Sequence, residues 1–239
     1  MILLTRLKEE NISIQKKISV KNINSISEPI TKIRYFTKTL EAENKKAFLV
    51  GSQQTLKIIK LKKNLKRIEG SIFFVIGKKS AMHLKKLKLN VKLVGINSSD
   101  LVSKIKRHKI FKDHEIEYLG SNVNNQKLIA DLKKIKNKVK KNIVYEVTPN
   151  NTFTKRTLNL VIKEKIKVVM LFSKFNSDTF LKICSHHKIK KQTLSKIHFV
   201  TMSKYTASQL LKTGLQVSWP SRPELSPMIK LALKKYKSH

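Results

Sequence analysis

Hydroxyl and lysine side chains recur where short apolar runs end and helical patterns begin. Backbone N–H groups at the start of a helix attract anions, and neighbouring lysines add positive charge. Such turns could bind the carboxylates of an acidic ligand. Alternatively, each hydroxyl only caps its helix, which contributes about 1 kcal/mol. The residues are Ser52, Lys78, Lys79, Ser80, Ser173, Lys204 and Thr206.

Two of these turns belong to a segment that occurs twice. Residues 73–91 read FFVIGKKSAMHLKKLKLNV, and residues 199–217 read FVTMSKYTASQLLKTGLQV. Each copy has the pattern of a strand, a polar turn and a helix. In both halves of the chain a strand that ends at a serine, Ser52 or Ser173, comes before this copy. The order predicts two similar domains, because a solenoid requires three or more repeats.

Apolar runs of four to seven residues alternate with longer amphipathic stretches, a pattern typical of an α/β protein with parallel sheets flanked by helices. Glycines end several runs, as suits a tight turn from a strand into a helix. The predicted strands are 1–4, 30–35, 47–50, 72–76, 91–94, 116–119, 143–147, 168–172, 198–201 and 216–219. The clearest predicted helices are 80–87, 124–135, 154–163, 178–185, 206–211 and 227–236.

The first strand needs partners from elsewhere, because residues 1–35 alone are too short to bury a core. We therefore predict a discontinuous α/β domain of residues 1–36 plus 150–239, with an inserted α/β domain of residues 37–149. The chain would cross between the domains near residues 35–39 and 147–151, and two such crossings form a natural hinge.

The charge is strongly positive, with 52 lysines and arginines against 15 acidic residues and a formal net charge of +37. This balance alone indicates a polyanionic partner such as nucleic acid. Two observations instead favour an A/T-rich coding sequence as the origin of the charge. The lysines are spread through nearly every segment, and Lys, Asn and Ile share A/T-rich codons. Arginine, the better fork for phosphates and bases, is scarce. Only Arg6, Arg34, Arg67, Arg107, Arg156 and Arg222 are arginines.

The sequence lacks the residues that several functional classes require. The single cysteine, Cys184, excludes an internal disulfide and favours a reducing compartment. Cys184, His186 and His187 have no second ligand group at zinc spacing, so we expect no metal. GKKS lacks the first glycine of a P-loop, and no G-x-S-x-G elbow occurs. Without an export signal or a run of 18 apolar residues, we expect a soluble, cytoplasmic chain.

Taken in order, several segments resemble the uroporphyrinogen-III synthase family. The ordered set, rather than any single segment, carries the resemblance. The segments are Thr5-Arg6 after the opening strand, EPI at 28–30, the strand ending at Ser52, VIGKKSA at 75–81, IVYE at 143–146, LFS at 171–173, KYTASQLLKTG at 204–214, and Pro223 before a final helix.

The resemblance implies a two-domain α/β enzyme whose cleft lies between domains joined by a two-stranded hinge. Such enzymes close hydroxymethylbilane to uroporphyrinogen III without a metal or an organic cofactor. The terminal hydroxyl leaves as water, and the last pyrrole ring is inverted through a spiro intermediate.

Applied to this chain, the resemblance makes Tyr145 the candidate that assists the leaving hydroxyl, unless it serves only packing. Arg6 could pair with a substrate carboxylate, or it could be a solvated surface arginine. Substrate binding would otherwise rest on Ser52, Lys78, Ser80, Ser173, Lys204 and Thr206.

Two other functions stay open from the sequence alone. The charge favours a basic RNA-binding α/β protein of ribosome assembly or modification. The GKKSA and SKYTA turns, which stand where the family usually has a Gly-Pro-Thr-Thr-Ala-like turn, would also fit a diverged copy that has lost activity. For the synthase we expect a monomer with hydroxymethylbilane as its small-molecule partner, no obligate nucleic acid and no membrane.

Overall fold

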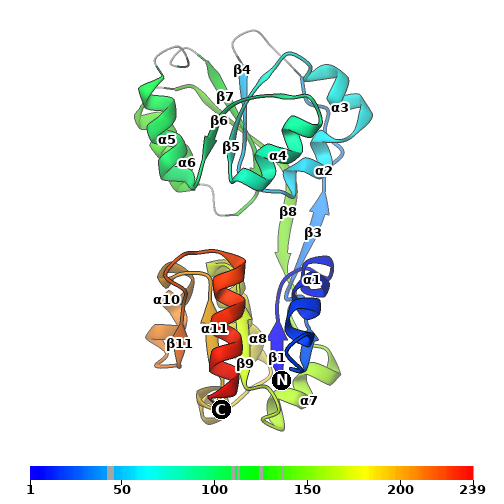
Figure 1. Ribbon diagram of the computed structural model, residues 1–239, viewed down its shortest axis with the longest axis vertical. Helices are drawn as coiled ribbons and strands as arrows, with labels where there is room; N and C mark the ends of the chain where they lie inside the picture. Colours follow the sequence, from blue (N-terminus) through cyan, green and yellow to red (C-terminus); the bar gives the residue numbers. More distant parts are fainter. Residues whose placement is uncertain (42–45, 109–110, 112–113, 124–125, 136, 239) are drawn as a thin grey trace. The chain divides into compact units, whose positions relative to one another are not determined.

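The computed structural model describes residues 1–41, 46–108, 111, 114–123, 126–135 and 137–238. The chain forms two compact units (Figure 1): unit 1 consists of Met1–Lys32 and Thr148–His239, and unit 2 of Ile33–Val147. The sequence places the first boundary four residues later, after residue 36, and the second after residue 149.

Unit 1 contains a parallel sheet with the strand order β2-β1-β9-β10-β11. The strands are β1 (Ile2–Leu4), β2 (Ser25–Ser27), β9 (Val168–Leu171), β10 (His198–Thr201) and β11 (Val217–Ser218). The helices are α1 (Lys8–Ser19), α7 (Lys155–Ile162), α8 (Lys174–His186), α9 (Lys191–Ser195), α10 (Lys204–Lys212) and α11 (Leu225–Lys237).

Successive residues of these buried strands point to opposite faces of the sheet, and helices cover both faces. Leu3, Val169 and Phe199 pack on the face covered by α7, α8, α9 and α10. Ile2 and Val168 pack on the other face, against α1 and α11. This alternation explains why β9, VVML, is apolar at every position.

Unit 2 contains a sheet with the strand order β3-β8-β7-β4-β5-β6. The strands are β3 (Thr31–Tyr35), β4 (Lys46–Val50), β5 (Ile72–Ile76), β6 (Asn90–Gly95), β7 (Glu115–Ser121) and β8 (Val139–Pro149). The helices are α2 (Thr55–Ile59), α3 (Lys62–Arg67), α4 (Lys78–Lys86), α5 (Ser98–Arg107) and α6 (Gln126–Lys134).

The two faces of this sheet are also covered separately. Phe48 and Val75 pack against α2 and α4, whereas Leu49 and Phe74 pack against α5 and α6. Strands β4 to β8 are parallel neighbours in the order β8-β7-β4-β5-β6. The fold class predicted from the sequence, two α/β domains with parallel sheets flanked by helices, is therefore confirmed.

The sequence repeat corresponds to β5 with α4 and to β10 with α10. The predicted strands all form, but β8 is longer than the predicted 143–147, and β2 was not predicted. Helix α8 begins at Lys174, four residues before the predicted start, because Ser173 caps it. Of the predicted helix 124–135, residues 124 and 125 lie outside the described residues.

Candidate functional site

Tyr145 lies on β8 near the carboxyl edge of the unit 2 sheet. Its register partner is Ser121, the last residue of β7, and the register shifts between Gly120 and Ser121. Ser52 follows β4, the next strand of the sheet. The side chains of Ser52 and Ser121 both hydrogen-bond the Tyr145 phenol. One tyrosine hydroxyl is thus held between hydroxyls from two neighbouring strands.

The Tyr145 side chain is buried, with 5% of the residue exposed. Burial raises the pKa of its phenol above the ordinary value of 10.0, and the nearby Tyr35 adds to the increase. The hydrogen bonds with Ser52 and Ser121 partly oppose that shift. The phenol therefore keeps its proton at neutral pH and can serve as a hydrogen-bond donor.

A second tyrosine supports this arrangement. The rings of Tyr35 and Tyr145 have centroids 6.2 Å apart. The Tyr35 hydroxyl donates to Oε1 of Gln54, and the Gln54 backbone N–H donates to Ser52 Oγ at 3.2 Å. The turn of Ser52 to Gln54 therefore contacts both tyrosines and fixes the serine beside Tyr145.

The α4 turn of unit 2 presents positive charge without a side-chain cap. Its N-cap is Gly77, which has φ +91° and no side chain that could cap the helix. The Gly77 N–H donates to the Gly95 carbonyl at 2.8 Å, which ties the ends of β5 and β6 together. Lys78 is exposed at the first position of the helix, whereas Ser80 is buried with 4% exposure.

The corresponding α10 turn of unit 1 has a cap that the sequence analysis did not single out. Ser203 Oγ accepts from the Thr206 N–H at 3.3 Å, and the two hydroxyls lie 3.2 Å apart. Thr206 is buried, and Lys204 is exposed at the first helical position. The signal for Ser203 was its place immediately before the helical run, with a threonine three residues later.

Ser173 caps α8 in the same unit. Its Oγ accepts from the Asn176 N–H at 3.1 Å, and Ser173 remains partly exposed. Arg6, which follows the neighbouring strand β1, forms a salt bridge with Glu10 and lies over the Phe172 ring at 5.1 Å. The positive charge of Arg6 is thus already compensated within unit 1.

Within each unit, the predicted residues gather along the carboxyl edge of a parallel sheet, where open α/β sheets bind ligands. In unit 1, Arg6, Ser173 and Lys204 follow the neighbouring strands β1, β9 and β10. In unit 2, Ser52 and Lys78 follow β4 and β5, and Tyr145 lies on β8. The sequence analysis did not identify Ser121, because the predicted strand 116–119 stopped before it, whereas β7 continues to Ser121.

In the described parts of the chain, no three His, Cys, Asp or Glu side chains form a group that could hold an ion. Burial raises the pKa of the Cys184 thiol to about 12. In the same described parts, no helix combines the length and the apolar character needed to cross a bilayer.

Two sheets with hydroxyl-bearing and lysine-bearing turns along their carboxyl edges define a two-domain α/β protein. The chain belongs to the uroporphyrinogen-III synthase family, since its sequence matches the family described as Uroporphyrinogen-III synthase HemD over residues 13–230. It is therefore a cyclising lyase of tetrapyrrole biosynthesis. The RNA-binding alternative gains no support from these comparisons.

Solved structures share this two-domain fold. Uroporphyrinogen-III synthetase from Helicobacter pylori has a TM-score of 0.67 and 15% identity, with 98% of each chain covered. A mutant uroporphyrinogen III synthase from the extremely thermophilic bacterium Thermus thermophilus has a TM-score of 0.63 and 11% identity, with 100% of this chain and 99% of that chain covered. No curated protein matches the sequence.

Proposed function

We propose that Tyr145 assists the departure of the terminal hydroxyl of hydroxymethylbilane. The observation that carries this proposal is the buried, protonated phenol between Ser52 and Ser121. The Ser121 hydroxyl donates to the Val123 carbonyl at 3.0 Å, so only Ser52 has a proton to donate to the phenol oxygen. The phenol proton, which faces Ser121 in the free protein, would turn to the leaving hydroxyl when the substrate binds. The electron-rich pyrrole donates the electrons that expel the hydroxyl, which leaves as water. The last pyrrole ring is then attacked, inverted through the spiro intermediate and joined to close the macrocycle.

We further propose that the strand-exit turns of both units receive the substrate carboxylates. Lys78 and Lys204 are exposed at the first positions of α4 and α10, where the helix dipole also favours an anion. Ser52, Ser173, Ser80 and Thr206 would support these turns, the last two from buried positions. Arg6 would take part only by exchanging Glu10 for a substrate carboxylate.

Formation of the type III product tests the activity. The protein is incubated with enzymatically generated hydroxymethylbilane, and the type I and type III products are separated. We expect type III in proportion to the amount of protein, because type I is the spontaneous outcome. Type I alone would contradict the activity and favour a diverged copy, and tight, salt-dependent RNA binding would revive the basic RNA-binding alternative.

Replacing Tyr145 with phenylalanine is expected to lower turnover by about tenfold without abolishing it, which corresponds to one hydrogen bond. The substrate ionises readily by itself, so activity should persist. Tyr236→Phe is the matched control, because the Tyr236 ring lies beside Lys167, which precedes β9, away from the strand-exit turns. Since the pKa of Tyr145 is raised above its ordinary value, we also expect no loss of rate from its ionisation at neutral pH. Full activity of Tyr145→Phe at saturating and limiting substrate would remove the phenol from the mechanism.

Neutralising Lys78 or Lys204 is expected to raise KM about two- to fivefold with little change in kcat, because a partly solvated charge contributes up to about 1 kcal/mol. The chain offers matched controls at the last residues of the same helices: Lys86 for Lys78 and Lys212 for Lys204. The measurement is the initial rate of type III formation for Lys→Gln variants at all four positions. Equal KM changes in the controls would mean that only the overall charge matters.

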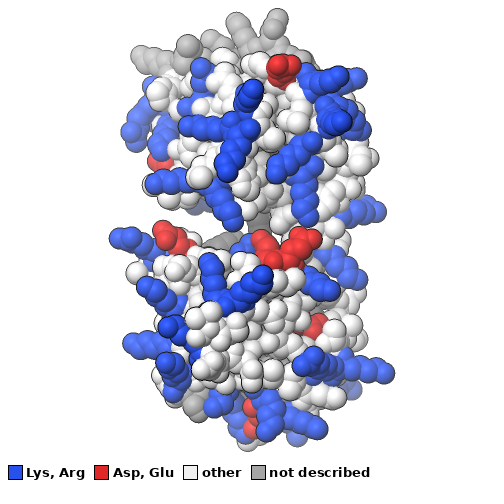
Figure 2. Space-filling view, turned by 45° about the vertical axis from the view of Figure 1, so that its right-hand side comes forward, with Lys and Arg blue, Asp and Glu red and all other residues white. Residues whose placement is uncertain are grey.

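We propose a cytoplasmic monomer without an obligate nucleic acid partner. The buried, single cysteine fits a reducing compartment. The positive charges are scattered over the visible face of the protein (Figure 2) and do not form one stripe on it. This dispersion fits a compositional origin of the charge better than a nucleic-acid footprint.

A further inference from the structure

A pocket of 430 Å³ opens in unit 2 beside the edge strand β6. It combines lysines with apolar side chains. The lining residues are Lys78, Ala81, Met82 and Lys85 of α4, Val94 and Gly95 of β6, Ile96, and Lys104 of α5. Its volume lies in the lower part of the range for small-molecule sites, about 300–1,000 Å³, so it suits one substituted ring rather than a four-ring macrocycle.

The wall formed by β6 and α5 is fixed by its own hydrogen bonds. The Asp100 carboxylate accepts from the Ile96 N–H at 2.8 Å and pairs with Lys104 Nζ at 2.9 Å. Lys104 also donates to the Val94 carbonyl at 2.8 Å. A side chain at Gly95 would meet Leu101 Cβ at 2.6 Å, so only glycine allows α5 to lie this close. The pocket is therefore shaped before any ligand arrives.

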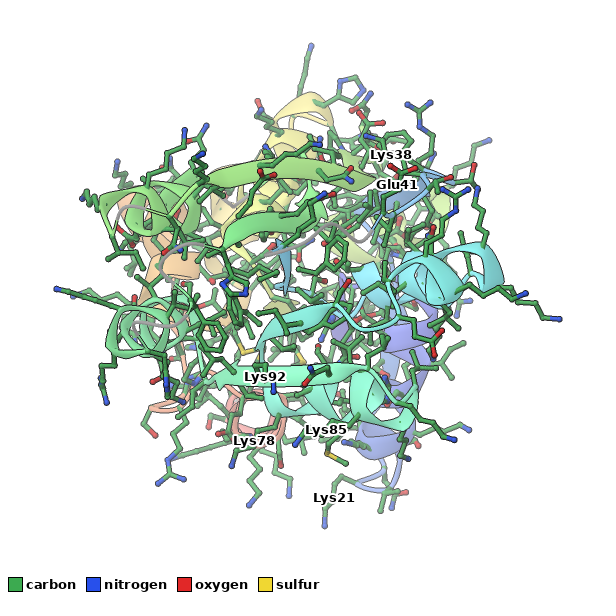
Figure 3. The ribbon with its side chains drawn as sticks, turned by 90° about the horizontal axis from the view of Figure 1, so that it is seen from above. Lys21, Lys38, Glu41, Lys78, Lys85 and Lys92 are labelled. Carbon is green, nitrogen blue, oxygen red and sulfur yellow. The ribbon has the colours of Figure 1, made fainter. Side chains whose placement is uncertain are left out.

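The opposite wall, on α4, leaves two positive charges available. Among the described residues, neither Lys78 nor Lys85 has an ion pair or a side-chain hydrogen bond. Figure 3 shows Lys78 and Lys85 extending from α4 on the same side of unit 2. Lys104 is already occupied, so the pocket offers two free cations to a ligand.

The same pocket exposes unusual apolar surface. Met82 is 58% exposed and Ile96 is 76% exposed, and both line the pocket with Ala81 and Val94. Apolar side chains grouped beside free lysines match a ligand with a flat apolar body and negative arms. Two free cations further match two carboxylates on that body.

We propose that this pocket binds one acid-bearing pyrrole ring, with its ring on Met82 and Ile96 and its two carboxylates on Lys78 and Lys85. The proposal rests on the proposed function in that the ring would be supplied by the tetrapyrrole. The same chemistry could come from a free monopyrrole diacid. Lys78, at the first turn of α4, is shared with the carboxyl edge of the sheet, so the pocket extends the substrate site beyond Tyr145 and the strand-exit turns.

Binding is tested with a monopyrrole that carries one acetate and one propionate arm, added to the full-length protein. Lysine acetylation followed by mass spectrometry should show protection of Lys78 and Lys85 and no protection of Lys86. Unsubstituted pyrrole and an aliphatic dicarboxylate each lack half of the required chemistry and should protect neither lysine. Equal protection by either control, or none by the monopyrrole diacid, would overturn the proposal.

Variants then show whether the bound ring belongs to the tetrapyrrole substrate or to a free monopyrrole. Lys85→Glu should weaken monopyrrole binding about tenfold, and Lys86→Glu, with the same charge change, should leave it unchanged. A matching rise in KM for hydroxymethylbilane in Lys85→Glu would assign the pocket to a ring of the substrate. An unchanged KM would overturn that assignment and leave a separate monopyrrole site. Protection of Lys85 in a protein that forms only type I product would refute the activity and not the pocket.

Discussion

Lys46→Met is expected to destabilise unit 2 by about 3–5 kcal/mol, because it leaves a buried carboxylate without its counter-charge. Lys46 Nζ lies 3.2 Å from Glu117 Oε2, and their side chains are only 3% and 5% exposed. The other carboxylate oxygen, Oε1, accepts from Asn142 Nδ2 at 2.7 Å. Three strands, β4, β7 and β8, thus meet at one buried charge pair.

The double variant Lys46→Met, Glu117→Gln distinguishes the cost of an unpaired carboxylate from the cost of altered packing. The introduced glutamine keeps an acceptor for Asn142 and removes the stranded charge, so we expect the double variant to recover at least half of the loss. Urea unfolding is followed by far-UV circular dichroism, while fluorescence of Trp219, the one tryptophan in the sequence, reports unit 1 separately. A double variant no more stable than Lys46→Met would show that the cost comes from packing alone.

This charge pair also illustrates what the sequence could and could not predict. The apolar runs predicted the central strands because these strands bury both faces. They are β1, β4, β5, β7, β9 and β10. Lys46 fell outside the predicted strand 47–50, because its partner, Glu117, lies on β7 in a distant part of the chain. A pattern in one segment carries no information about a counter-charge supplied by another.

The sequence analysis did not predict the full length of β8 or the existence of β2, for related reasons. Residues 139–142 read VKKN, and their lysines conceal a strand that gains neighbours on both sides, β7 and β3. Strand β2 has only three residues, SIS, and forms by pairing with β1. In both cases tertiary pairing outweighs local propensity.

The candidate site was predictable to the extent that it depends on strand ends. Ser52, Lys78, Ser173 and Lys204 follow strands whose apolar patterns are clear. Ser121 was not predictable, because it contacts Tyr145 through a register shift that only the assembled sheet defines. The other two hydroxyl residues, Ser80 and Thr206, were also expected at the turns, but they stand at the third helical position and are buried.

Glu28→Gln is expected to destabilise unit 1 by about 3 kcal/mol, because hydrogen bonds to a buried charged acceptor are strong and their donors would lose it. Glu28 is 3% exposed. Its carboxylate accepts from the Thr154 N–H at 3.1 Å, from Thr154 Oγ1 at 2.6 Å and from Thr157 Oγ1 at 2.5 Å. It therefore satisfies donors at the start of α7 and complements the helix dipole.

Glu164→Gln is the matched control in the same unit. Glu164 pairs with Lys196 at 2.7 Å, but its side chain is 40% exposed, so the loss should stay within about 1 kcal/mol. Urea unfolding monitored by Trp219 fluorescence compares the two variants, and equal midpoints would contradict a special role for Glu28. The comparison matters for function because Glu28 precedes β3 and Thr154 follows β8. One hydrogen-bonded cluster of Glu28 and Thr154 therefore lies where the first connecting segment begins and where the second one ends. Glu28 also belongs to the EPI segment that contributes to the family resemblance.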